Sequence, residues 1–243
     1  MRRPVQSTLL TLTGLGLLHA TLLTDTYLRY VKAGLRPPLI VSGLVLLVLG
    51  LAGAAVRGWQ QTAAGAGHEH GHDHTGTPRV AWLLFLPAVS LLFYAPPAPG
   101  AYTAAHASDK PITVQRGFAP LPAGSPLPLT LTDFTKRVQQ DRSRAIAGRT
   151  VRLTGFASPA GDDGWYLTRI IFSCCAADSQ TVKVRMYGGE VPAADTWLAV
   201  TGTWHPRGTL GTRTATAALD VRDARPVTQP VNAYTDDLPL RPS

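Results

Sequence analysis

The sequence contains few cysteines and none of the common motifs of enzymes. Only two of its 243 residues are cysteine, Cys174 and Cys175, and they are adjacent. Two cysteines are too few for a disulfide framework, so their number does not identify the redox compartment. The sequence also lacks a nucleotide-binding glycine loop, a nucleophile elbow, a zincin helix and a paired-carboxylate constellation. We therefore expect a protein that is not an enzyme and has no catalytic residues.

Long runs of one charge are also absent. The net charge of +8 at pH 7 would suit an anionic lipid surface or a nucleic acid. The Lys and Arg residues are scattered along the chain, with no run longer than a pair such as Arg2-Arg3. A scattered pattern favours membrane lipid as a partner and argues against nucleic acid.

Apolar residues are concentrated in the first third of the chain. About 20 apolar residues are needed to cross a bilayer, and apolar segments occupy residues 5–23, 39–56 and 80–95. The last of these is short, but Trp82 and Tyr94 lie near its ends, where interfacial aromatic residues are favoured. The sequence predicts a membrane domain over residues 1–95 with two to three transmembrane helices in a plasma membrane.

The cations beside these segments suggest an orientation. An arrangement with the N-terminus inside places Arg2, Arg3, Arg57 and Arg79 in the cytoplasm. Residues 95–109, which follow the third segment, contain no cation and should be translocated easily. We therefore predict an extracytoplasmic C-terminal domain. A third segment that is re-entrant or lies on the surface would reverse this conclusion.

A histidine-rich tract lies between the second and third apolar segments, at residues 65–76. Neutral imidazole is a good ligand for Zn, Ni or Cu, so this tract is a candidate metal site. Its glycine flanks and alternating spacing are equally typical of a flexible segment that binds metal weakly. The candidate metal ligands are the imidazoles of His68, His70, His72 and His74.

The remainder of the chain predicts a small β-domain. A linker rich in Pro and Ala covers residues 96–128, and a helix is expected from Leu131 to Ile146 with Thr132 as N-cap. Alternating apolar residues predict five strands, the last at residues 215–221. The predicted fold class is thus an α+β membrane protein whose C-terminal part, 129–226, is a helix plus an all-β barrel of the OB type. Residues 227–243 are expected to be an extended tail.

The adjacent cysteines follow the second predicted strand and allow three interpretations. One thiol could pack inward as a small apolar group while the other lies at the rim. The two thiols could instead bind Zn or a soft metal with Asp178 or His205. They could also form a strained vicinal disulfide. The cofactor is thus unknown, with a Zn-like or soft metal ion as the candidate for Cys174, Cys175 and Asp178.

An OB barrel could also bind an oligonucleotide by stacking bases on a strand. Trp165, Tyr166 and Arg169 are the candidate residues for such stacking. Fold alone does not establish this function, and an extracytoplasmic location argues against it.

Several segments resemble one family of membrane proteins. The motifs that carry the resemblance are Leu153-Thr-Gly-Phe156, Tyr166-Leu-Thr-Arg-Ile170, Ser173-Cys-Cys-Ala-Ala-Asp178 and Trp197-Leu-Ala-Val-Thr-Gly-Thr-Trp204. With these motifs and its N-terminal spans, the sequence resembles the YcgQ-like family of uncharacterised bacterial membrane proteins, and its histidine-rich loop resembles the actinobacterial branch. The resemblance implies an accessory subunit of a multi-span, YcgR-like predicted permease, without a defined substrate.

Three functional hypotheses follow. The first is a membrane-anchored accessory subunit of a permease, with an extracytoplasmic β-domain that carries the Cys-Cys site. The second is a stand-alone metal-binding membrane protein that acts as a sensor or metallochaperone. The third is a thiol redox protein, which the lack of a Cys-x-x-Cys motif disfavours.

Overall fold

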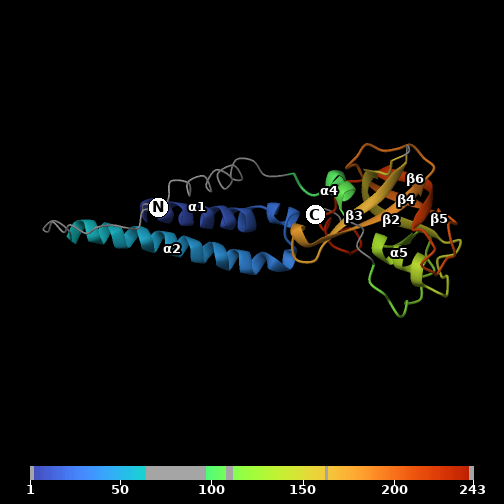
Figure 1. The fold of residues 1–243 in the computed structure, drawn as a ribbon, viewed down its shortest axis with the longest axis horizontal. Helices are drawn as coiled ribbons and strands as arrows, with labels where there is room; N and C mark the ends of the chain where they lie inside the picture. The colour runs from blue at the N-terminus through green and yellow to red at the C-terminus, as the bar shows by residue number, and fades with distance from the viewer. Residues whose placement is uncertain (1–2, 64–96, 108–111, 162–163, 241–243) are drawn as a thin grey trace. The chain divides into compact units, whose positions relative to one another are not determined.

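The computed structural model describes residues 3–63, 97–107, 112–161 and 164–240 of the chain (Figure 1). The chain divides into two compact units, Met1–Ala98 and Pro99–Ser243. The third predicted span at 80–95 and the histidine-rich tract at 65–76 lie outside the described residues.

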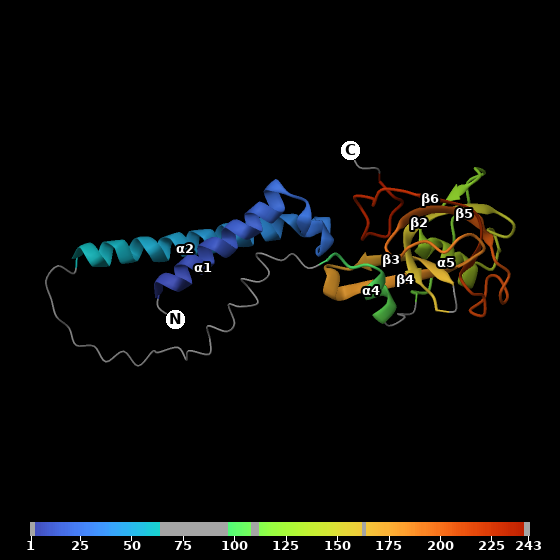
Figure 2. The same ribbon diagram turned by 90° about the horizontal axis from the view of Figure 1, so that it is seen from above.

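The N-terminal unit contains two helices that lie side by side (Figures 1 and 2). Helix α1 covers Arg3–Leu18, and a π-helical turn, His19–Leu23, continues it. Two short 3-10 turns, Thr26–Arg29 and Ala33–Leu35, then lead into α2, which covers Arg36–Ala63.

Small residues allow the two helices to approach closely. A methyl group built on Gly14 of α1 would lie 2.7 Å from the carbonyl oxygen of Gly43 in α2. A methyl group on Gly53 of α2 would lie 2.8 Å from the Ser7 hydroxyl oxygen. Larger side chains at these positions would separate the backbones, as is general for helix pairs in lipid.

One stretch of the described chain, Ala33–Val56, is helical, long enough and apolar enough to cross a membrane. It contains the predicted span 39–56. The predicted span 5–23 is helical throughout, but its α-helical part has only 16 residues. Of the two to three predicted transmembrane helices, one is therefore supported by length and composition within the described residues.

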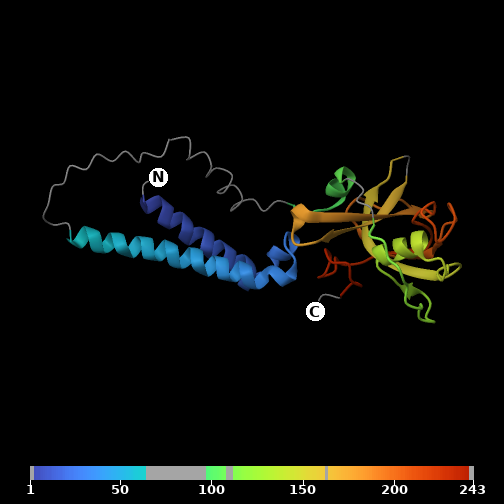
Figure 3. The same ribbon diagram turned by 60° about the horizontal axis from the view of Figure 1, so that its bottom comes forward.

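The C-terminal unit is built on a mixed six-stranded sheet (Figure 3). The strands are β1 (Leu127–Pro128), β2 (Thr150–Pro159), β3 (Trp165–Phe172), β4 (Ser179–Tyr187), β5 (Trp197–Trp204) and β6 (Ala218–Pro226). The strand β2 pairs with β3 and also with β5, so the pairings run from β2 through β3, β4, β6 and β5 back to β2. Within this order β4 and β6 are parallel. The barrel of the OB type stays a prediction.

Alternation along the strands determines the core. On β4, the side chains of Val182, Val184 and Met186 are buried, and the side chains between them are partly exposed. Helix α5 (Leu131–Gln140) contributes Phe134 and Val138 to the same cluster. The core is therefore shared between this helix and one face of the sheet.

Helix α5 is shorter than the sequence predicted. Its N-cap is Thr130, whose hydroxyl accepts a hydrogen bond from the Asp133 N–H at 3.1 Å, and not Thr132. The helix ends at Gln140 and not at Ile146, because Asp141 has an extended backbone with φ of −79° and ψ of 95°. The chain then turns at Arg144 and Gly148, which have φ of 54° and 68°. Ile146 still reaches the core from this loop. The helix predicted to precede the strands is thus present, with different bounds.

The segments on either side of the β-domain also differ from the prediction. The predicted linker 96–128 contains a short helix, α4 (Ala101–His106), whose Ala101 and Ala104 are buried, and also β1. The fifth long strand begins at Ala218 and not at 215. Within the tail, residues 231–237 form turns and bends instead of an extended chain.

Candidate functional site

The cysteine pair lies at the turn of the β3–β4 hairpin. These two strands pair in register from Trp165↔Met186 to Phe172↔Ser179. Their hairpin extends past the ends of the neighbouring strands (Figures 2 and 3). Residues 173–178 form the connecting loop, so the register of the hairpin determines where the thiols are presented.

Two backbone hydrogen bonds shape this loop. The Ser173 N–H donates to the Asp178 carbonyl at 3.0 Å, and the Asp178 N–H donates to the Cys175 carbonyl at 3.1 Å. Residues Ala176–Asp178 form one 3-10 turn. The loop is thus closed across its base, and both cysteines lie within it.

The two thiols are unbonded and accessible. The Sγ atoms of Cys174 and Cys175 are 3.7 Å apart. Cys174 is exposed and Cys175 is partly exposed. The interpretation in which one thiol packs into the core is therefore wrong, because neither belongs to the buried cluster. Both cysteines are free thiols in this structure, so the vicinal disulfide stays a hypothesis about the oxidised protein.

The loop makes the two thiols chemically unequal. The pKa of Cys175 is lowered, mainly because the backbone N–H groups of Ala177 and Asp178 donate to its sulfur, with a further contribution from the Cys174 thiol. The pKa of Cys174 is raised, mainly because its thiol donates to Cys175. Cys175 is therefore the more readily ionised of the two thiols. A thiolate is the form that attacks electrophiles and binds metal.

The residues predicted to complete a metal site do not gather around the thiols. Within the described parts of the chain, no three or more His, Cys, Asp and Glu side chains converge. His205 lies at the end of β5, where its Nδ1 is 2.7 Å from an Asp220 carboxylate oxygen and its ring stacks on Tyr187. Tyr187 ends β4, whereas the cysteine loop precedes it, so His205 lies roughly 25 Å from the thiols along that strand.

The C-terminal tail packs against the strand that leads into the cysteine loop. Tyr234 stacks on Phe172 with ring centroids 4.5 Å apart, and its carbonyl accepts the Phe172 N–H at 3.0 Å. The Arg169 guanidinium donates to the carbonyls of Asn232 and Thr235 at 3.0 and 2.9 Å. The tail therefore supports the end of β3 that lies next to the cysteine loop.

Arg169 is buried and is not available as a stacking residue. Its guanidinium lies over the Trp197 ring at 5.4 Å. Burial lowers its pKa to about 10, against the opposing effect of Asp236 and Asp237. Trp165 is also buried, at 3% exposed. Of the three residues proposed for base stacking, only Tyr166 faces a cavity, so the strand is not the predicted stacking platform.

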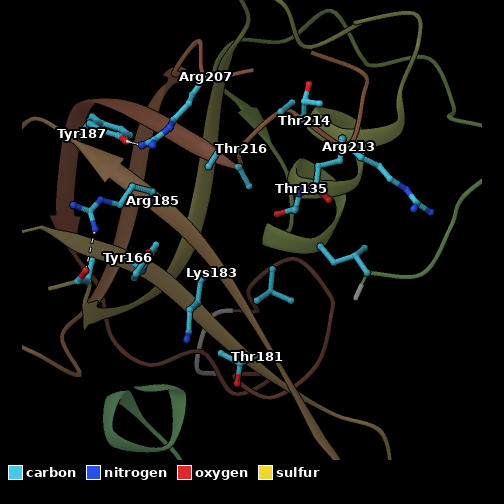
Figure 4. A pocket seen from close by; sticks show the side chains of 16 residues that line it. Thr135, Tyr166, Thr181, Lys183, Arg185, Tyr187, Arg207, Arg213, Thr214 and Thr216 are labelled. Carbon is cyan, nitrogen blue, oxygen red and sulfur yellow. Dashed lines mark hydrogen bonds between the residues drawn. The ribbon is translucent and has the colours of Figure 1, made fainter. Parts of the chain in front are cut away.

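Sequence reasoning missed a basic cavity on the outer face of the sheet. The cavity, of about 800 Å³, lies between β3 and β4 on one side and the loop that joins β5 to β6 on the other (Figure 4). Its lining includes the cations Lys183, Arg185, Arg207 and Arg213. The alternation of β4 was a usable signal, because Thr181, Lys183, Arg185 and Tyr187 all point away from the core.

Comparison with known proteins identifies one domain. A DUF1980 C-terminal domain is found at residues 132–235. This segment contains α5, the strands β2 to β6, the cysteine loop and the docked part of the tail. No curated protein and no solved structure matches the chain.

Proposed function

We propose that the chain is a membrane-anchored accessory subunit of a multi-span permease, and that its C-terminal domain binds a Zn-like or soft metal ion through Cys174 and Cys175. The observation that carries the proposal is the pair of free thiols, 3.7 Å apart on an accessible loop, of which one has a lowered pKa. The metal would be the substrate of the permease and not a resident cofactor.

The separation of the two sulfur atoms supports binding of one metal ion. Two thiolates bound at about 2.3 Å to one tetrahedral ion lie about 3.8 Å apart. The sulfur atoms of Cys174 and Cys175 already have this spacing, and the N–H groups of Ala177 and Asp178 favour the thiolate form of Cys175. The pair would therefore bind a metal ion with little rearrangement of the loop.

A site with two protein ligands is suited to transfer. Structural zinc sites are closed by four protein ligands, whereas sites with an open position exchange ligands. The described residues offer no third His, Cys, Asp or Glu that converges with the thiols. The remaining positions would be filled by water, or by groups of the permease during transfer of the ion.

The membrane anchor and the permease partner are supported by different observations. The apolar stretch Ala33–Val56 supports an anchor, and the helix α1 beside it would be a second span. The DUF1980 C-terminal domain is consistent with the YcgQ-like family, whose members suggest a YcgR-like permease as partner. The extracytoplasmic position of the domain depends on the third predicted span and is part of the proposal.

The finer fold proposal is an OB-type barrel. The return of the pairings to β2 and the parallel pairing of β4 with β6 support it. In this fold one face of the second and third strands, with the adjoining loops, is a ligand surface. If β2 is the first strand of the barrel, these two strands are β3 and β4, which the thiol loop joins.

Metal binding is tested on the full-length chain in detergent. We expect about one equivalent of Zn²⁺, or of a softer ion, to bind the reduced protein and protect both thiols from alkylation. The double variant Cys174→Ser, Cys175→Ser should lose this binding, and Ser173→Ala in the same loop should retain it. Equal binding by the double variant would exclude the site.

The permease partner is tested by isolation from native membranes with a C-terminal affinity tag. Co-purification of a multi-span permease in near-equal amount supports the accessory subunit. Recovery of the chain alone, with metal binding intact, would favour the stand-alone metal protein. Loss of two hydrogen atoms on oxidation, reversed by a dithiol, would favour the redox alternative, which the short distance between the two sulfur atoms makes chemically accessible.

A further inference from the structure

The basic cavity beside β4 has the features of a ligand site, and they are independent of the cysteines. Among the described residues of the chain, the 16 that line it include no Asp or Glu. Its four cations come from two sides, with Lys183 and Arg185 on β4 and Arg207 and Arg213 on the β5–β6 loop. Figure 4 shows that Arg213 is directed away from the other three, so an anion in the cavity would be stabilised chiefly by Lys183, Arg185 and Arg207.

Two of these cations are held in place by aromatic and backbone groups. The guanidinium of Arg185 lies 5.4 Å from the Tyr166 ring centroid and 6.0 Å from that of Tyr187, and it donates to the Ala160 carbonyl at 3.2 Å. The Arg207 guanidinium donates to the Tyr187 hydroxyl at 3.1 Å. Each guanidinium has five N–H donors, so one such contact leaves donors for a ligand.

The backbone also makes room for Arg185. A methyl group built on Gly164, at the end of the β2–β3 turn, would collide with the Arg185 guanidinium. The Tyr187 ring is itself fixed by stacking on His205 at 3.9 Å between centroids. The arginines are thus positioned before a ligand arrives, which reduces the entropy that binding would cost.

We propose that this cavity binds a small anion with at least two phosphate groups. Guanidinium groups match the geometry of phosphate oxygens, and cations on two sides of one cavity suit a ligand with more than one phosphate. The hydroxyl groups of Thr181 and Thr216 line the same cavity and can also donate to phosphate. The volume of about 800 Å³ is within the range of small-molecule sites, roughly 300–1,000 Å³.

A nucleic acid strand fits this cavity less well. Proteins that bind single strands stack successive bases on aromatic rings. Here Tyr166 lies against Arg185, and Tyr187 contacts both Arg185 and His205. The tyrosines therefore support the cations and do not form a platform for bases.

The test is a calorimetric titration of the full-length protein in detergent with inorganic tripolyphosphate at low salt. We expect one saturable site that weakens as salt is raised. The variants Arg185→Gln and Arg207→Gln should each weaken binding about 10-fold, which corresponds to loss of a charged hydrogen bond. The control Arg152→Gln removes an exposed cation from β2 and should change the affinity less than about twofold.

Further titrations identify the source of the phosphate and show whether the cavity binds its ligand independently of the cysteine pair. Binding of a short-chain lipid with a pyrophosphate headgroup in place of tripolyphosphate, with the same variant pattern, supports a lipid headgroup as the ligand. Preference for an oligothymidylate at equal phosphate concentration would overturn the small-molecule proposal, as would equal losses in Arg152→Gln. The Cys174→Ser, Cys175→Ser variant should bind tripolyphosphate normally, so failure of the metal site and failure of this site are distinguishable. Near-ultraviolet circular dichroism confirms that each variant is folded.

Discussion

The two units of the molecule place their apolar side chains in opposite ways. In the C-terminal unit Leu153, Leu167 and Val184 are fully buried. In the N-terminal unit Val41 and Val48 are 58% and 62% exposed, and small residues occupy the contact between the helices. The hydrophobic effect in water explains the first arrangement. The second is the arrangement expected of helices in an apolar solvent, in which tight backbone contact and not apolar burial holds helices together.

The largest effect on stability is expected from a cavity in the buried core of the C-terminal unit. Phe134→Ala removes a fully buried ring from α5 and should lower the free energy of unfolding of the C-terminal unit by about 3–5 kcal/mol. Urea unfolding followed by tryptophan fluorescence would measure the loss. Val191→Ala, at a side chain 51% exposed, is the control and should cost much less. Equal losses would mean that the described core is not the source of stability.

A smaller effect is expected where the tail docks. Arg169→Ala removes the hydrogen bonds to the carbonyls of Asn232 and Thr235 and should lower the free energy of unfolding by about 2–4 kcal/mol. Faster hydrogen exchange at the Phe172 amide, which donates to Tyr234, would show that the tail has been released. Arg222→Ala, an exposed cation on β6, should leave that amide protected. Unchanged exchange in Arg169→Ala would contradict the docking.

Association of α1 with α2 should be weakened by a larger side chain at the helix contact, and not by a smaller side chain on the exposed face. Gly14→Leu forces a side chain against the backbone of α2 and should cost about 1–3 kcal/mol of helix association. The measurement is disulfide formation between Ser7→Cys and Gly53→Cys in a chain without its native cysteines. The Cβ positions are 3.9 Å apart, which suits a disulfide.

Two controls sharpen the helix experiment. Leu15→Ala, at a side chain 49% exposed, should leave the cross-link unchanged. Moving one cysteine to the exposed neighbour, in Thr8→Cys with Gly53→Cys, should prevent it. Efficient cross-linking of that pair would show that α1 presents a different face to α2.

The smallest effect concerns the two thiols. The lowered pKa of Cys175 gives it the larger thiolate fraction at pH 7, so it should react several-fold faster with iodoacetamide than Cys174. The difference should shrink at alkaline pH, where both thiols ionise. Peptide mass spectrometry after brief labelling would measure the ratio. Cys174→Ala removes one donor to Cys175 and should slow its reaction at pH 7, and no change would contradict the thiol contact.

Local patterns predicted the elements of the C-terminal unit well. The alternation at residues 150–156, 165–172, 181–187 and 197–204 predicted the four strands β2 to β5. The start of β6 was misplaced because Ala215 and Ala217 are buried although they precede the strand. Its end was missed because its later residues, such as Arg222 and Asp223, are exposed and do not alternate with apolar ones. The helical spacing of Phe134 and Val138 was correct, but Ile146 enters the core from a turn that no periodicity reveals.

Features that depend on distant parts of the chain were not predicted. The cavity requires the β5–β6 loop to face β4, so Arg207 and Arg185 become neighbours of Tyr187 only in the folded domain. The docking of Tyr234 on Phe172 joins residues far apart in sequence. The adjacent cysteines were identified as a candidate site, but their unequal pKa depends on the backbone of one short turn.

The alternation of β4 has a consequence for how this domain can evolve. Val182, Val184 and Met186 serve the core, while Thr181, Lys183 and Arg185 face the cavity. Point substitutions at Thr181, Lys183 and Arg185 can change the cavity and leave the core intact, since these side chains are not part of the buried cluster, whereas Val182 belongs to both. Insertion or deletion of a single residue would exchange the two faces, placing charge in the core and valine on the surface. The ligand preference of this strand is therefore free to drift, while its length is not.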